Sequence, residues 1–120
     1  KAGGLIIINV PSISKLFSKY DYAVGHLRRY NKNKFYILKK KLNIQLISLN
    51  YWGLLLLPFL ILRKFLLIFH KQKNFKKIIN KGWKTNRYLN IFFNILMNFE
   101  LRFFNKIFLG TSLMVFFRKL

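Results

Sequence analysis

The chain has 120 residues, of which 23 are Lys or Arg and 2 are Asp or Glu, so its formal net charge is +21. This length predicts one domain, because two would each be too small for a good core. A free globular protein with this charge would repel itself, which predicts a polyanionic partner, either nucleic acid or an anionic lipid surface. The absence of cysteine excludes disulfides and thiolate metal sites.

Residue usage is also skewed toward amino acids with AT-rich codons. The sequence has 17 Lys, 12 Asn, 14 Ile, 14 Phe and 6 Tyr, together 63 of 120 residues. Mutational pressure toward A and T explains this excess, and small organelle genomes are a common source of that pressure. The codons of Asp and Glu are not unusually poor in A and T, so codon bias does not explain why only two acids occur. Their scarcity indicates selection against negative charge, as phosphate binding requires.

The first segment predicts a short strand. An apolar, β-branched run follows two glycines at residues 5–8, and Pro11 ends it. The start resembles neither a secretory signal nor an Arg- and Ser-rich presequence, which fits synthesis inside an organelle. Residues 15–41 are basic with interleaved aromatics, so we describe residues 1–41 as a basic strand and extension region.

Residues 42–69 predict a strand followed by a helix. Apolar residues alternate with Asn and Gln over residues 42–49, which is the period of a half-buried strand. The following block is apolar, and Pro58 within it would kink a helix or start a new one from about Phe59.

The last third predicts a dense basic segment and a long helix. Residues 70–87 are rich in Lys, and Tyr88 to Phe108 is the clearest helical segment, with polar residues at every fourth position. The sequence stays apolar to Phe117, so we expect the long apolar helix to occupy residues 88–117. So narrow a polar stripe predicts that other surfaces largely cover the helix.

These elements predict a small single α+β domain over residues 1–120, mostly helical, with basic extensions. We expect RNA and neighbouring proteins to stabilise it. The chain resembles, as a class, the short, very basic and acid-poor ribosomal proteins of AT-rich mitochondrial genomes. We therefore expect a structural constituent of the mitochondrial ribosome in the matrix, with ribosomal RNA and neighbouring ribosomal proteins as partners.

Two groups of basic and aromatic residues are the candidate RNA-binding residues. Lys and Arg neutralise phosphates and release counterions, while aromatic rings can stack on unpaired bases. The first basic group is Arg28, Arg29, Tyr30, Lys32, Lys34, Lys39, Lys40 and Lys41. The second basic group is Lys71, Lys73, Lys76, Lys77, Lys81, Trp83, Lys84 and Arg87. The alternative for either group is a solvated lysine-rich surface with its aromatics turned into the core.

Catalysis has no support in the sequence. His26 and His70 lack the convergent ligands of a metal site and an orienting partner for a base. Asp21 and Glu100 are distant in sequence, and we expect Glu100 to pair with a Lys or Arg one turn away. We therefore predict no enzyme activity, catalytic residue, metal, cofactor or small-molecule substrate.

The competing hypothesis is a membrane subunit of a respiratory complex or ATP synthase. Residues 42–62 contain no charged residue over 21 positions, long enough for a transmembrane helix. Asn, Gln and Ser lower the hydropathy of this segment. Basic residues flank both of its ends, so the positive-inside bias predicts no orientation.

Overall fold

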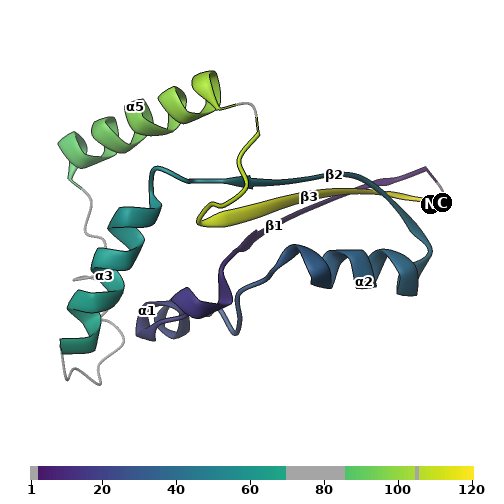
Figure 1. Cartoon of the computed structure of the whole chain (residues 1–120), viewed down its shortest axis with the longest axis horizontal. Coiled ribbons are helices and arrows are strands. Elements are labelled where there is room, and N and C mark those ends of the chain that lie inside the picture. The colour runs from purple at the N-terminus through teal and green to yellow at the C-terminus, as the bar shows by residue number, and fades with distance from the viewer. Residues whose placement is uncertain (1–2, 70–85, 105) are drawn as a thin grey trace.

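The computed structural model describes residues 3–69, 86–104 and 106–120. Within these ranges the chain forms one small α+β domain with four helices and a three-stranded antiparallel sheet (Figure 1). Helices account for 49% and strands for 26% of the structure, so the predicted α+β class is confirmed, whereas a clear predominance of helix is not supported.

The sheet is built around the last segment of the chain. Its strands are β1 (Leu5–Pro11), β2 (Ile44–Trp52) and β3 (Ser112–Lys119), in the order β1-β3-β2 with both pairs antiparallel. The strand in 5–8 and the strand beginning near 42 are therefore confirmed. The predicted helix over 88–117 is wrong at its end, because residues 112–117 alternate between buried and half-buried side chains and form the central strand.

Helix α2 (Lys32–Leu42) covers one face of the sheet (Figure 1). Its Phe35 packs with Leu113, Val115 and Phe117, all three fully buried, to form the core together with Ile44. The helix ends at Asn43, whose φ of 49° turns the chain directly into β2. With the short helix α1 (Lys19–Ala23), these elements show that residues 3–41 belong to the folded domain and are not an extension of it.

Helix α3 (Leu57–Phe69) follows β2 after a tight turn. Pro58 occupies its second position, which confirms the predicted helix start, since proline lacks only an N–H that would be unpaired there. Residues 42–62 thus contain the last residue of α2, the strand β2, a turn and the beginning of α3, which contradicts a single transmembrane helix over this segment. Among the described residues, no helix has both the length and the apolar character needed to cross a membrane.

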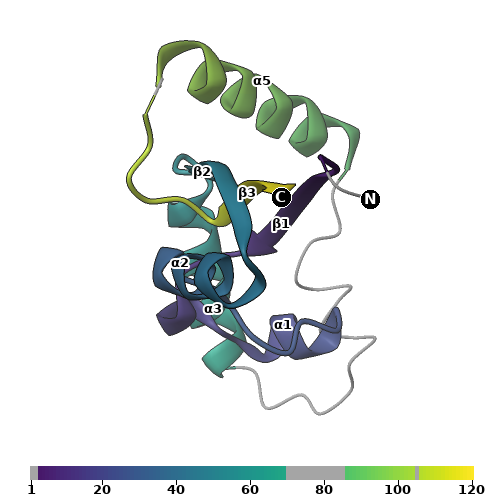
Figure 2. The ribbon, with the colours of Figure 1, turned by 90° about the vertical axis from the view of Figure 1, so that its right-hand side faces the viewer.

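Helix α5 (Arg87–Phe103) lies on the side of the sheet opposite α2 (Figure 2). Asn86 caps it, because the Asn86 side-chain oxygen accepts a hydrogen bond from the Leu89 N–H at 2.9 Å. The helix predicted from Tyr88 is confirmed, although it ends at Phe103 instead of Phe108.

Candidate nucleic-acid interface

Both acidic residues of the chain are buried. Asp21 is 1% exposed and Glu100 is 0% exposed, and the sequence contains no other Asp or Glu. Every charged side chain at the protein surface is therefore a cation. Two buried carboxylates cannot neutralise the field that those cations produce around the molecule.

Asp21 organises the segment between β1 and α2. One carboxylate oxygen accepts hydrogen bonds from the Ser18 N–H at 2.9 Å and the Ser18 hydroxyl at 3.0 Å, which holds the first turn of α1. The other oxygen lies 2.8 Å from a guanidinium nitrogen of Arg29. Arg29 is 4% exposed and also donates to the Ser12 carbonyl at 3.0 Å. Arg29 is thus a structural residue, and the prediction that it contacts RNA is wrong, because a phosphate cannot reach this buried guanidinium.

Glu100 joins α5 to the turn between β2 and α3. One carboxylate oxygen accepts from the Gly53 N–H at 2.6 Å and the other from the Leu55 N–H at 2.8 Å. The carboxylate thus satisfies backbone donors in the turn that leads into α3, where a negative charge also complements the helix dipole. The expected pairing of Glu100 with a cation one turn away is wrong, because the carboxylate points into the fold.

Most of the first basic group lies exposed on or beside α2. Lys34, Lys39, Lys40 and Lys41 are exposed along this helix, and Arg28 is exposed in the loop before it. Lys32 is half-buried, with its ammonium nitrogen 4.6 Å from the centre of the Tyr51 ring. Phe35 on the same helix turns into the core, whereas Lys34, Lys39, Lys40 and Lys41 remain at the surface.

Tyr30 belongs partly to the core and partly to the surface. Its ring is half-buried, and its centre lies 5.8 Å from that of Phe35. The Arg28 Nε donates to the Tyr30 hydroxyl at 3.0 Å, and the Lys34 ammonium lies 5.6 Å from the ring centre. The two cations therefore flank one aromatic ring.

The sheet adds two cations that the sequence analysis did not select. Arg118 and Lys119 end β3, and Lys119 pairs with Ile44, the first residue of β2. Because β2 begins directly after α2, this pairing brings the end of β3 to the end of α2 (Figure 1). Lys39, Lys40 and Lys41 thus share one end of the molecule with the two β3 cations. Only the strand pairing reveals this cluster, which we name the sheet-end cluster.

The second basic group is almost entirely outside the described residues. Lys71, Lys73, Lys76, Lys77, Lys81, Trp83 and Lys84 all fall in residues 70–85. Arg87 is described and exposed at the start of α5. The prediction for this group stays a prediction.

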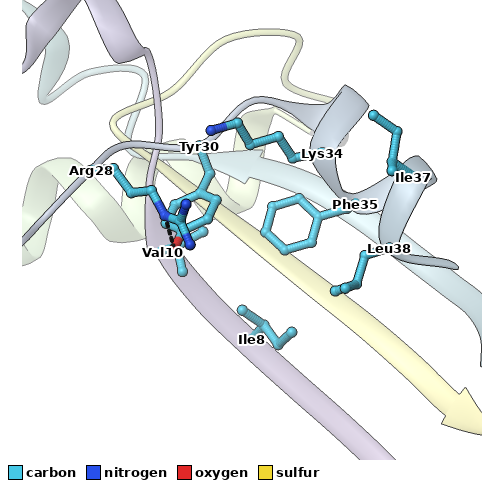
Figure 3. Close-up of a pocket in the computed structure, with 8 residues that line it drawn as sticks. All are labelled: Ile8, Val10, Arg28, Tyr30, Lys34, Phe35, Ile37 and Leu38. Atoms are coloured by element: carbon cyan, nitrogen blue, oxygen red, sulfur yellow. Dashed lines mark hydrogen bonds between the residues drawn. The ribbon is translucent and has the colours of Figure 1, made fainter. Parts of the chain in front are cut away.

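A pocket of about 450 Å³ lies between α2 and the edge strand β1, and we name it the α2–β1 pocket (Figure 3). Its apolar residues come from both elements, and Arg28, Tyr30 and Lys34 supply its polar atoms. Its lining comprises Ile8, Val10, Arg28, Tyr30, Lys34, Phe35, Ile37 and Leu38. The pocket combines apolar surface with cations and contains no acid.

The remaining titratable groups suggest no other chemistry. His26 is half-exposed, and its Nδ1 lies 3.6 Å from a carboxylate oxygen of Asp21. His70 lies outside the described residues. The Arg63 guanidinium lies 3.9 Å from the centre of the Tyr20 ring, and burial lowers the pKa of Arg63 from its ordinary value. Among the described residues, no three His, Asp or Glu side chains lie close enough together to hold a metal ion.

Comparisons with protein-family models, with curated proteins and with solved structures find no match to this chain. Inference about its function therefore depends on the arrangement of its own residues. A surface with cations of several elements and no acid can bind polyanions through phosphate contacts.

Proposed function

We propose that the protein is a structural RNA-binding component of the mitochondrial ribosome, encoded by an AT-rich organelle genome. The observation that supports this proposal most strongly is the burial of both acids beneath a surface whose charged side chains are all basic. An anionic partner with many phosphates would neutralise this surface, and RNA supplies one phosphate per nucleotide.

The proposed mechanism is electrostatic positioning of RNA without sequence readout. The sheet-end cluster presents five cations from two elements at one end of the molecule, where they can contact neighbouring phosphates. Lys34, the exposed lysine of α2 that lies outside this cluster, and Arg28 would extend the contact along the helix. The second basic group would add further phosphate contacts, although all of its members except Arg87 lie outside the described residues.

Exposed apolar side chains support an assembled state with neighbouring proteins. On α5, Tyr88, Ile95, Phe99 and Phe103 are spaced at helical intervals and are 80%, 64%, 51% and 65% exposed. Helix α3 also exposes Phe69 at 81%. Exposed apolar side chains along one face of a helix, as on α5, are typical of a surface that contacts another protein. Neighbouring ribosomal proteins would cover it and stabilise the domain together with RNA.

Sucrose-gradient fractionation of detergent-solubilised mitochondria tests the proposal. We expect the chain to co-sediment with a ribosomal subunit, and nuclease treatment or high salt to release it. A respiratory or ATP-synthase subunit would instead remain in carbonate-washed membranes and migrate apart from ribosomal RNA. That second pattern would contradict the proposal.

A further inference from the structure

We infer that the α2–β1 pocket binds a single unpaired nucleotide of the RNA, with the base against the apolar wall and its phosphate at the cations Arg28 and Lys34 beside the Tyr30 ring. This inference rests on the proposed RNA-binding function and deepens it, because it assigns one site to a nucleotide that is not in a helix. Figure 3 shows the arrangement from which it follows.

The two cations of the pocket both lie beside the Tyr30 ring, and no carboxylate pairs with either of them. The Arg28 guanidinium carbon is 5.3 Å and the Lys34 ammonium nitrogen 5.6 Å from the centre of the same Tyr30 ring. Neither carboxylate of the chain can neutralise them, since Asp21 bonds Ser18 and Arg29 and Glu100 bonds the turn before α3. Since no carboxylate offsets either charge, an anion bound beside the Tyr30 ring would be stabilised by both cations.

The Tyr30 ring also fixes the direction of these cations. Arg28 donates its Nε–H to the Tyr30 hydroxyl at 3.0 Å, which restrains one edge of the guanidinium while the terminal nitrogens stay available for a phosphate. Tyr30 is itself held against Phe35 in the core and by a backbone hydrogen bond from its N–H to the Pro11 carbonyl at 2.9 Å. The anion site is therefore attached to a rigid part of the fold.

The rest of the pocket suits a flat apolar group. Ile8 and Val10 of β1 face Phe35 and Leu38 of α2 across it (Figure 3). Its volume of about 450 Å³ is ample for a nucleobase, and its aromatic and aliphatic walls can contact a base that has left the stack. The cations and the apolar walls together can bind a phosphate that carries an adjoining flat ring. A base-paired nucleotide would not fit, because its base stays within the helix.

The test compares three RNA hairpins that differ at one position. The first has a fully paired stem, the second has one unpaired nucleotide in the stem, and the third has an abasic residue at that unpaired position. We expect the full-length protein to bind the second hairpin about tenfold more tightly than either of the others, which is typical of one base contact with aromatic side chains.

Two pairs of variants locate the effect in the pocket. Ile37→Trp fills the pocket mouth from an exposed position, and Tyr36→Trp adds the same ring at the neighbouring exposed position, which does not line the pocket. We expect Ile37→Trp to abolish the preference and Tyr36→Trp to keep it. Likewise Lys34→Gln should reduce the preference, whereas Lys39→Gln should weaken binding to all three hairpins alike.

The outcomes separate this inference from the proposed function. Salt-dependent binding to all three hairpins with equal affinity would overturn the nucleotide site and leave RNA binding intact. Failure to bind any of them would overturn both. Binding of an extended peptide with acidic and apolar residues that depends on Lys34 and Ile37, without discrimination among the hairpins, would assign the pocket to a protein partner and overturn the inference.

Discussion

Asp21 and Arg29 form an ion pair in which both side chains are almost completely buried, with 2.8 Å between the carboxylate oxygen and the guanidinium nitrogen. Arg29 continues the connection to the Ser12 carbonyl, and the Ser12 hydroxyl donates to the Gly110 carbonyl. This chain of contacts links the loop before α2 to the residues that precede β3. The pair therefore stabilises the junction of three segments that are distant in sequence.

Replacing Asp21 should strongly destabilise the domain. In Asp21→Asn the buried Arg29 charge loses its counter-ion, and breaking a buried pair in this way costs about 3–5 kcal/mol. Urea unfolding followed by circular dichroism would measure the free energy of unfolding. Lys40→Gln, which changes an exposed charge on α2, should alter that free energy by less than about 0.5 kcal/mol. Equal stability of Asp21→Asn and the wild type would show that the pair contributes nothing.

Glu100→Gln should weaken the attachment of α5 to the turn after β2. The carboxylate accepts from two backbone N–H groups, whereas an amide offers one oxygen and places an NH₂ group against the other donor. An unsatisfied buried donor costs about 1–3 kcal/mol. Hydrogen exchange of the Gly53 and Leu55 amides should become faster. Asn94→Gln, at an exposed position of the same helix, should leave both amides unchanged.

Gly53→Ala should be more harmful than the same change at Gly25. Both glycines have positive φ, 79° and 83°, so alanine is strained at either position. A Cβ at Gly53 would clash with the Thr111 hydroxyl oxygen, whereas nothing lies within 4 Å of one at Gly25. We expect a loss of about 2–4 kcal/mol at Gly53 and about 1–2 kcal/mol at Gly25, measured by chemical unfolding. Similar losses at both positions would contradict the predicted steric contact.

Removing charges from the sheet-end cluster should reduce the salt dependence of RNA binding. Each lost phosphate contact lowers the slope of log Kobs against log salt by about 0.7–0.9. Lys40→Gln with Lys41→Gln, and separately Arg118→Gln with Lys119→Gln, should both show this decrease. Lys15→Gln with Lys19→Gln removes two exposed charges near α1 and is the matched control. An equal decrease in the control would show that net charge matters and the cluster does not.

The sequence predicts those elements whose signal is local. The β-branched run before Pro11, the alternation after Leu42 and the proline at the start of α3 are each visible in a few neighbouring residues, and the structure confirms all three. The strand β3 was missed because its alternating residues are all apolar. Leu113 and Val115 differ from their equally apolar neighbours only in burial, and that burial depends on the position of β3 between two partner strands.

The candidate site is less predictable from sequence, for a physical reason. Arg28 and Arg29 are adjacent and chemically identical, yet one is exposed beside the α2–β1 pocket and the other is buried against Asp21. The two arginines differ in burial because the fold brings Asp21 to Arg29 and not to Arg28. The residues next to them in the sequence do not show this. The contribution of Arg118 and Lys119 likewise depends on the strand register that places them beside the end of α2.

The position of β3 also sets the order of events during synthesis. Strands β1 and β2 have no direct hydrogen-bonded pairing with each other, because both pair with β3. A ribosome must therefore translate almost the whole chain before any part of the sheet can close, and the nascent polypeptide carries two unsatisfied strand edges until then. Such a delay favours maturation beside RNA or a chaperone that shields the incomplete domain.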